Sequence, residues 1–537
     1  MKKSILLLLV ALAAYAQLQE ISGERIRAHV KFLASDLLEG RGVGTRGGEL
    51  AAAYLATQFA LIGARPAGDD GTYFQKVPLV GVQAQPNAQL SASAAGRTLT
   101  FRWLDEFVGA NYRQHPLEEF EAEAVFIGHG IVAPEYQWDD YKNTDVRGKI
   151  VVLFTNEPPS NDPKFFGGRA LTYYGRWTYK FEQAARAGAL AALIIHTDQT
   201  AGYGWDVVRN SWSGEETLVR LAPDRNELAF AGWLTQQAGD KLLGLAGRSV
   251  AEMLKASESR SFKPVPLGIR LRGRIESKIR DIVTANVAAI IPGSDPALRE
   301  EAVIFSAHWD HLGIGAPVGG DSIYNGAVDN ATGCAILLEI ARLWASLEPK
   351  PPRSALFLAV TAEEGGLRGS EYYAQHPIIP PGKTAVALNV DAIFPFGRTR
   401  DVVVNGAERT TFWPQVQEIA ARMGLIIRPD PRPEQGNFYR SDHFPFAKAG
   451  IPAFTVDEGD QYVGKPDDYG AKMFAEFNAK HYHQPSDEYR DDWDMSSMEQ
   501  IGRFVFLLGQ SAAHLEKLPT WNTGDEFLEA RRKSGID

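Results

Sequence analysis

Hydrophobic residues in the second half of the chain alternate between short continuous runs and runs with helical spacing. The runs that have the length of buried strands lie at 303–307, 356–360, 385–390 and 453–456, with helical segments at 331–344 and 370–374. Loops rich in glycine and polar residues separate them. This strand–loop–helix alternation predicts an α/β fold, a doubly wound mixed sheet with helices on both faces.

The first half has a different pattern. Apolar residues at helical spacing predict helices over 22–38 and 50–61, and residues 88–118 alternate like strands. Further on, strand-like runs at 124–127, 150–154 and 190–195 enclose a helical segment at 179–189. These runs predict a separately folded, β-rich module inserted in the α/β domain. The expected division is a leader at 1–16, a first part of the main domain at 17–118, the module at 119–270 and the remainder at 271–537.

The N-terminus has the three-part pattern of an export signal. Lys2 and Lys3 precede a short apolar run at 5–12, and Ala14 and Ala16 supply the small residues of a cleavage site. We therefore expect an exported protein, periplasmic or secreted, that begins at Gln17. No later run has the length and apolar character of a membrane span, so no membrane insertion is expected after cleavage.

Composition narrows the classes of partner and of site. The chain has 537 residues and a formal net charge of -10, which argues against nucleic acid as a partner because phosphate binding needs a basic surface. Cys334 is the only cysteine. An internal disulfide and a cysteine-built zinc site are therefore excluded, so any metal must be held by His, Asp and Glu.

Metal-binding residue types follow three of the predicted strands. His308 follows the run at 303–307, Glu363 and Glu364 follow 356–360, and Asp391 follows 385–390. Two adjacent carboxylates at the end of a buried strand are costly unless a positive group lies beside them. Since sites in open α/β sheets form beyond the carboxyl ends of strands, these side chains are expected to meet at one edge.

Two further residues complete a ligand set for two metal ions. Asp329 precedes the helix at 331–344, where an aspartate is also a common helix cap. His483 lies in a polar segment near the C-terminus, where a histidine is also common on a surface. Each is weak evidence alone, whereas two histidines, two aspartates and a glutamate together have the composition of a two-metal site.

These motifs, in order, resemble those of the co-catalytic di-zinc aminopeptidases, which share a fold with glutamate carboxypeptidase and the transferrin receptor. The resemblance covers roughly residues 282–515 and the helices near 22–62, and the module resembles the inserted protease-associated domain of many members. The residues that carry the resemblance are His308-Trp309-Asp310, Gly326-Ala327-Val328-Asp329-Asn330, Glu363-Glu364-Gly365, Asn389-Val390-Asp391, and His483 with Asp487.

The resemblance implies a role for each ligand residue. Asp329 bridges two zinc ions, for which cobalt or manganese could substitute, and is joined to the next residue by a cis peptide. His308 and Asp391 complete the first metal site, and Glu364 and His483 complete the second.

Four further roles follow from the same comparison. Glu363 is the general base that takes a proton from a water activated by the two metals. Asp310 and Asp487 each orient a ligand histidine. Tyr482 is a candidate hydrogen-bond donor to the oxyanion, although a packed aromatic ring remains the alternative.

Three other histidines leave alternatives open. His443, in Ser441-Asp442-His443, either contacts substrate or serves the structure of its loop. His481 competes with His483 as a ligand, but Pro485 and Asp487 match the pattern of the family that the chain resembles only when counted from His483. His311 is expected to pack at the strand end rather than to bind metal.

The expected function is that of an exopeptidase removing N-terminal amino acids from peptides, with the free amine held by carboxylates such as Glu363 and Asp391. A carboxypeptidase or dipeptidase on the same scaffold is the first alternative, and Arg398, Arg400 and Arg440 are available for a C-terminal carboxylate. A non-enzymatic binding protein like the transferrin receptor, or a single-metal glutaminyl cyclase, is a weaker one. Side-chain preference and oligomeric state stay open.

Overall fold

A computed structural model describes residues 21–162, 164–221 and 227–536, so the expected leader at 1–16 lies outside the described residues. The chain forms two compact units. The first contains the segment up to Val77, Val283–Pro431 and the segment from Arg440 onward, and the second contains Pro78–Ile282 and Arg432–Tyr439. The second unit therefore interrupts the first along the chain.

The first unit is built on a mixed sheet with a parallel centre. Strands β17, β14, β18 and β21 pair in parallel in that order, and β13 and β19 pair antiparallel at the two sides. The strands in spatial order are β13 (Val265–Ile291, of which the part from Val283 belongs here), β17 (Ser354–Val360), β14 (Ala302–His308), β18 (Thr384–Asn389), β21 (Ala453–Glu458), β19 (Asp401–Asn405) and β20 (Ile426–Arg428), with β1 (Arg65–Pro66) and β2 (Phe74–Ala84) against β13. Every residue of β14, β17 and β18 is buried, which explains their continuous apolar runs.

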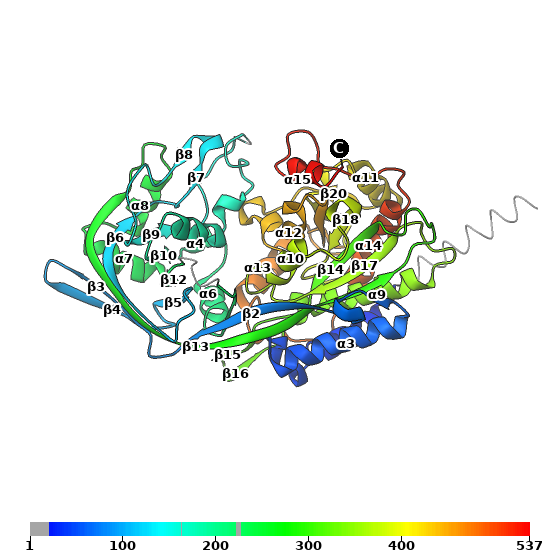
Figure 1. Cartoon of the computed structure of the whole chain (residues 1–537), viewed down its shortest axis with the longest axis horizontal. Coiled ribbons are helices and arrows are strands. Elements are labelled where there is room, and N and C mark those ends of the chain that lie inside the picture. The colour runs from blue at the N-terminus through cyan, green and yellow to red at the C-terminus, as the bar shows by residue number, and fades with distance from the viewer. Residues whose placement is uncertain (1–20, 163, 222–226, 537) are drawn as a thin grey trace, which may run out of the picture. The chain divides into compact units, whose positions relative to one another are not determined.

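Helices cover both faces of this sheet, which confirms the predicted doubly wound α/β fold (Figure 1). On one face α9 and α14 pack on the parallel strands, and α2 and α3 pack against α9. On the other face α12 packs on β18 and β21, with α10 against it. The helices of this unit are α2 (Gly23–Leu33), α3 (Arg46–Ile62), α9 (Thr332–Ser346), α10 (Arg368–Gln375), α11 (Trp413–Arg422), α12 (His443–Lys448), α13 (Tyr469–Lys480), α14 (Ser496–Ala513) and α15 (Leu528–Lys533).

The helix ends follow local sequence signals. The side chain of Ser22 caps α2 by accepting the N–H of Arg25, and Thr45 caps α3 in the same way through Gly48. Gly63 ends α3 in the left-handed conformation, with φ of 84°. The predicted helix over 22–38 stops early, because the chain turns at Ala34 and Asp36–Arg41 forms a separate 3-10 segment.

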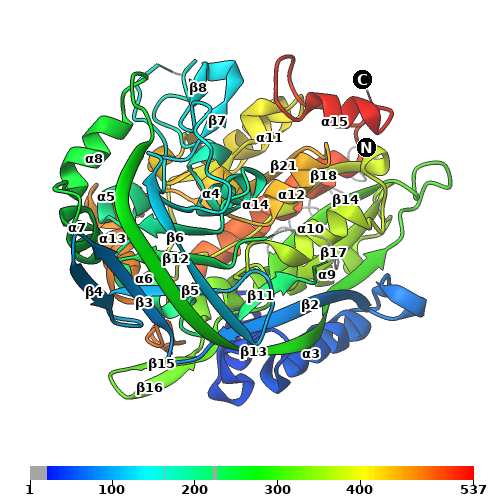
Figure 2. The same ribbon diagram turned by 60° about the vertical axis from the view of Figure 1, so that its left-hand side comes forward.

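The second unit has its own sheet and its own cores. Strand β6 (Leu117–Phe126) runs beside the first part of β13 as an antiparallel ribbon (Figure 2). Strands β6, β9, β10 and β12 form a parallel series. The other elements are β3 (Gln89–Ala94), β4 (Arg97–Phe101), β5 (Phe107–Ala110), β7 (Val132–Ala133), β8 (Trp138–Asp139), β9 (Ile150–Phe154), β10 (Ala191–Ile195), β11 (Glu216–Val219), β12 (Phe230–Leu234), α4 (Trp177–Arg186), α5 (Asp198–Ala201), α6 (Trp205–Ser211), α7 (Gln236–Gly244) and α8 (Val250–Ser257).

This unit differs from the module expected at 119–270. It begins at Pro78, because β3 pairs with β13 and β5 pairs with β12, so these strands belong to the sheet of the second unit. It also mixes helices with strands rather than being mainly β. Within residues 21–162, 164–221 and 227–536, no helix has both the length and the apolar character needed to cross a bilayer.

Candidate metal centre

The parallel register of the central strands brings the predicted ligands to one edge of the sheet. His308 is the last residue of β14 and lies opposite Val360, the last residue of β17. Ser306 lies opposite Asn389, the last residue of β18. The residues that follow β17 and β18 therefore emerge beside His308, as the strand-end argument predicts.

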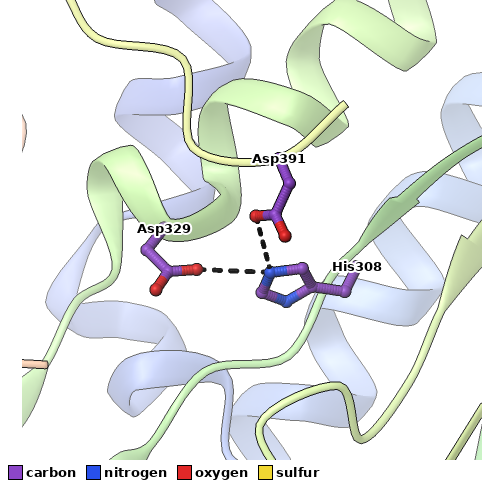
Figure 3. Close-up of side chains that lie close together, drawn as sticks. All are labelled: His308, Asp329 and Asp391. Atoms are coloured by element: carbon purple, nitrogen blue, oxygen red, sulfur yellow. Dashed lines mark hydrogen bonds and ion pairs between the residues drawn. The ribbon is translucent and has the colours of Figure 1, made fainter. Parts of the chain in front are cut away.

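His308, Asp329 and Asp391 form the first group of donors (Figure 3). The Nε2 atom of His308 lies 3.2 Å from Oδ1 of Asp329 and 3.1 Å from Oδ1 of Asp391. His308 is 1% exposed. Its other ring nitrogen, Nδ1, faces the backbone carbonyl of Asp310 at 3.1 Å, so Nε2 is the atom turned to the two carboxylates.

The second group shares Asp329 with the first. Its other oxygen, Oδ2, lies 3.5 Å from Nε2 of His483, and the same nitrogen lies 3.1 Å from Oε2 of Glu364. His311 also lies at this group: its Nδ1 atom is 2.6 Å from Oε1 of Glu364, and donor atoms of His311, Asp329 and Glu364 all lie within 4.8 Å of one another. Asp329 thus turns one oxygen to each group, as a bridging carboxylate must.

The donor set fits zinc. Nitrogen and oxygen ligands at 2.0–2.2 Å in a tetrahedron lie about 3.3 Å from one another. The separations between donor atoms of the five predicted ligand residues, 3.1, 3.2, 3.1 and 3.5 Å, cluster around that value. Imidazole and carboxylate donors also suit zinc chemically.

The loop that carries Asp329 is held by hydrogen bonds to its backbone. The peptide between Asp329 and Asn330 is cis, as the family resemblance implied. The side chain of Asn330 donates to the carbonyl of Val390 and accepts the N–H of Ala392, so it ties this loop to the segment around Asp391. These contacts fix two ligand loops relative to each other.

The carboxylates of Asp487 and Asp310 bind backbone N–H groups of the ligand loops. The carboxylate of Asp487 accepts the N–H groups of Val328 and Asp329. The carboxylate of Asp310 accepts the N–H groups of Glu363 and Glu364, and its nearest oxygen is 3.9 Å from Nδ1 of His308. Each loop has buried N–H groups that need an acceptor, and these aspartates supply it. That each of them also orients a ligand histidine stays a prediction.

Arg41 supports the same region from the N-terminal segment. Its guanidinium is 1% exposed and donates to the carbonyl groups of Leu33, Trp309 and Gly326 at 2.7–2.8 Å. It also donates to the carbonyl of Asn325. Arg41 therefore joins α2, the end of β14 and the loop that leads to Asp329.

Glu363 has an environment different from that of Glu364. Within the described residues its carboxylate receives no hydrogen bond, and burial together with the charges of Glu364 and Asp391 raises its pKa well above the ordinary value. Burial alone would raise the pKa of Glu364 too, but His483 and His311 hold it at about 2. The pKa values of the two neighbours thus move in opposite directions, up for Glu363 and down for Glu364.

Tyr482 and His443 are the remaining residues predicted to act at this site. The hydroxyl of Tyr482 accepts a hydrogen bond from Nη2 of Arg440 at 3.3 Å, and burial raises the pKa of the hydroxyl above its ordinary value. His443 is 0% exposed at the start of α12, and its role toward substrate stays a prediction. Two residues before it, the hydroxyl of Ser441 donates to Oδ2 of Asp391 at 2.5 Å and accepts from Asn389.

Backbone conformation adds to the special character of this edge. Ala362, Ala392 and His483 have φ of 54°, 54° and 55°. Non-glycine residues rarely adopt this left-handed region, and such residues gather at functional sites. Here each one immediately precedes, follows or is a predicted metal ligand or base.

Sequence reasoning did not predict the contacts that four residues make at this site: His311, Arg41, Arg440 and Ser441. The predicted loop at 39–48 contains Arg41, but no pattern shows that its side chain turns inward. Ser441 and Arg440 lie beside the segment that was singled out for His443. His311 was noticed and assigned to packing, because its distance to Glu364 depends on the path of two loops.

Comparisons with known proteins agree with this geometry. Residues 286–508 match the model of Peptidase family M28. Aminopeptidase YwaD of Bacillus subtilis is 26% identical over 398 residues, which are 73% of this chain and 69% of that protein. Carboxypeptidase Q of Xenopus laevis is 27% identical over 263 residues, 49% of this chain and 45% of that protein.

The fold is also found in a solved structure. The aminopeptidase from Aneurinibacillus sp. strain AM-1 superposes with a TM-score of 0.55 at 19% identity and covers 95% of this chain and 98% of its own. The matched residues 286–508 contain the five predicted metal ligands and Glu363. The family resemblance predicted from the metal-binding motifs is thereby confirmed over residues 286–508, the segment that matches peptidase family M28.

Proposed function

We propose that this protein is a zinc-dependent exopeptidase that removes N-terminal amino acids from peptides. The observation that carries the proposal is that the two oxygens of the Asp329 carboxylate face different histidines: Oδ1 faces His308, and Oδ2 faces His483. Glu363 is the neighbour of the ligand Glu364 in the chain. The names of relatives, among them Aminopeptidase YwaD, support the same activity.

Five residues would hold two zinc ions. His308 and Asp391 would complete one site, Glu364 and His483 would complete the other, and Asp329 would serve both. Bound zinc acts as a Lewis acid and lowers the pKa of a water molecule to about 7. The carboxylates of Asp310 and Asp487, which accept backbone N–H groups of the ligand loops, would keep these loops in place when zinc is bound.

Glu363 is the general base in this proposal. One of its carboxylate oxygens takes the proton of the attacking water and then delivers it to the leaving nitrogen of the peptide. The absence of a hydrogen bond to this carboxylate, within the described residues, leaves its lone pairs available. Burial, with the charges of Glu364 and Asp391, raises the pKa of this carboxyl above its ordinary value.

In this proposal, Tyr482 and Arg440 stabilise the negative charge that develops on the substrate oxygen in the transition state. The guanidinium of Arg440 donates to the oxygen of the Tyr482 hydroxyl, so the hydroxyl hydrogen is free to point elsewhere. A donor placed where charge develops in the transition state lowers the barrier. We assign this role to the hydroxyl of Tyr482.

Carboxylates give the site its preference for a free amine. Asp391 and Glu363 add negative charge beside the donors, and a protonated or metal-facing N-terminal amine is complementary to it. A carboxypeptidase or dipeptidase is the second candidate, because Carboxypeptidase Q of Xenopus laevis is similar at nearly the same identity. In that second candidate, Arg440, which donates to Tyr482, would be a cation that meets a C-terminal carboxylate.

One experiment separates these activities. The purified protein, with zinc and after its removal by a chelator, is assayed on three peptides of one sequence: free, acetylated at the N-terminus and amidated at the C-terminus. Zinc-dependent cleavage of the free and amidated peptides but not of the acetylated one is the expected result. Cleavage that needs the free C-terminus would establish the second candidate, and cleavage unaffected by zinc removal would refute the metal mechanism.

We further propose that the protein is exported and that its second unit is an inserted protease-associated module. The N-terminal pattern at 1–16 supports export. The interruption of the first unit by residues 78–282 supports the insertion. Cell fractionation of the full-length chain, with N-terminal sequencing of the mature protein, tests the predicted start at Gln17.

A further inference from the structure

His311 makes a close contact with only one oxygen of Glu364. Its Nδ1 atom lies 2.6 Å from Oε1, whereas Nε2 of His483 faces Oε2 at 3.1 Å. The two oxygens of this carboxylate are therefore in different surroundings. One faces the predicted metal ligands and the other faces His311.

The distance indicates a hydrogen bond rather than shared coordination. Two ligands of one tetrahedral zinc ion lie about 3.3 Å apart, and the predicted ligand pairs lie at 3.1–3.5 Å. A separation of 2.6 Å is too short for two ligands of the same ion and close to that of a hydrogen bond to a charged carboxylate, about 2.7–2.9 Å.

The ring of His311 is held in one orientation. The residue is 2% exposed, and its backbone N–H donates to the backbone carbonyl of Arg41. The ring also packs edge to face against His483, with 5.7 Å between the ring centres. Within the described residues, Nε2 has no hydrogen-bond partner. Because an ionised carboxylate only accepts hydrogen bonds, Nδ1 is the nitrogen that carries the hydrogen in the contact with Glu364.

We propose that His311 is the positioning residue of Glu364: it donates Nδ1–H to Oε1 and leaves Oε2 as the single oxygen that binds metal with His483 and Asp329. This role rests on the proposed two-metal site. A free carboxylate can rotate or bind through both oxygens, so ordering it in advance raises metal affinity. Removal of such a partner lowers metal affinity by about 10–100-fold.

The effect is confined to one of the two sites. Glu364 lies with Asp329 and His311 in the second group of close donors, and His483 lies 3.1 Å from it, whereas the first group consists of His308, Asp329 and Asp391. Loss of the His311 hydrogen bond is therefore expected to weaken one zinc ion and to leave the other in place. This asymmetry separates a positioning role from general loss of structure, which would release both ions.

The test compares His311→Asn with His311→Leu in the full chain. The amide nitrogen of asparagine stands at about the distance of Nδ1 from the backbone and donates a hydrogen bond, whereas leucine has similar bulk and no donor. His481→Asn is the matched control, because His481 contacts Ser486 instead of Glu364. Zinc stoichiometry and the affinity of each ion are measured by competition with a chromophoric chelator, with thermal unfolding to verify folding.

We expect the leucine variant to hold one ion as tightly as the wild type and the other about 10–100-fold more weakly, and the asparagine variant to stay within a few-fold of the wild type. Two ions bound with unchanged affinity in the leucine variant would overturn this inference alone. Equal weakening in both variants would also overturn it, since His311 would then be a ligand. A wild-type protein that binds no zinc would overturn the proposed function as well.

Discussion

The carboxylate of Asp487 accepts the backbone N–H of Asp329 at 3.1 Å, across 158 positions of sequence. It accepts the N–H of Val328 as well. Asp329, whose two oxygens face two groups of donors, is thus held through its backbone by Asp487. The predicted contact between Asp487 and a ligand histidine stays a prediction, whereas the contact with the backbone can be tested directly.

Asp487→Asn should loosen the Asp329 loop. The amide would present a donor to two N–H groups that now share one carboxylate, and an unsatisfied buried group costs about 1–3 kcal/mol. We expect the loss to appear in the free energy of unfolding and, by about 10–100-fold, in zinc affinity. Asp491→Asn, at a side chain 83% exposed, is the control. Equal zinc affinity in both variants would exclude the proposed support.

Glu363→Gln should separate metal binding from turnover. The amide keeps the shape of the side chain but cannot take a proton, and general base catalysis contributes about 10²–10⁴-fold. We expect kcat to fall by at least that range while zinc content stays at the wild-type value. Metal analysis and steady-state kinetics on the same preparation provide the measurement. A variant that cleaves peptides at the wild-type rate would show that another residue is the base.

Tyr482→Phe should reduce kcat with little effect on KM or zinc content. Removal of one donor to an oxyanion lowers kcat by about 10²–10³-fold, and the hydroxyl is the only atom lost. Comparison with Tyr489→Phe, another tyrosine of the same segment, controls for loss of a hydroxyl in general. If KM rises while kcat is unchanged, Tyr482 binds the ground state of the substrate instead.

Arg41→Met should destabilise the first unit. The change would leave the carbonyl groups of Leu33, Trp309 and Gly326 without their donor, at about 1–3 kcal/mol for each buried group. We expect a loss of about 3–5 kcal/mol in the free energy of unfolding, measured by chemical denaturation. Arg41→Lys, which can satisfy some of these groups, should lie between methionine and the wild type. A methionine variant as stable as the wild type would contradict this account.

His129→Gln should reduce the acid sensitivity of the second unit. His129 is 1% exposed, and burial lowers its pKa from 6.5 to about 3. The folded protein keeps the ring neutral while the unfolded chain takes up a proton below pH 6.5. This contribution to stability is therefore fully present above pH 6.5 and is lost as the pH falls toward 3, by about 1.4 kcal/mol per pH unit.

The measurement is the difference between the wild type and His129→Gln at two pH values. Between pH 7 and pH 5 the wild type should lose about 2 kcal/mol more in its free energy of unfolding than the variant. Asp140, Glu157 and Lys180 also titrate in this unit, but they are present in both proteins, so the difference isolates His129. Parallel pH profiles would show that His129 is protonated in the folded state.

Much of the first unit could be predicted because its central strands are buried on both faces. Such strands appear as continuous apolar runs, and β14, β17 and β18 begin and end within two residues of the predicted positions. Their parallel order then places the residues after each strand at a common edge. For that reason His308, Glu364 and Asp391 could be named as neighbours before their distances were known.

The second unit was harder to delimit. The long strand β13 runs from Val265 to Ile291 and contributes to both units, and its exposed and buried residues alternate over much of its length. Alternation shows that a strand has one buried face but not which strand lies beside it. The start of the unit at Pro78 depends on pairings between segments that are far apart in the chain.

The amino-acid sequence by itself determined the α/β class, the strands that end at the metal centre and the residue types able to hold zinc, because these depend on local periodicity and on the chemistry of single side chains. Only the tertiary structure decided which groups support them. Asp310 caps the Glu363 loop, Asp487 holds the backbone of Asp329, His311 faces Glu364 and His443 is buried. A hydrogen bond depends on distances of a few tenths of an ångström between loops, and those distances follow from packing of the whole unit.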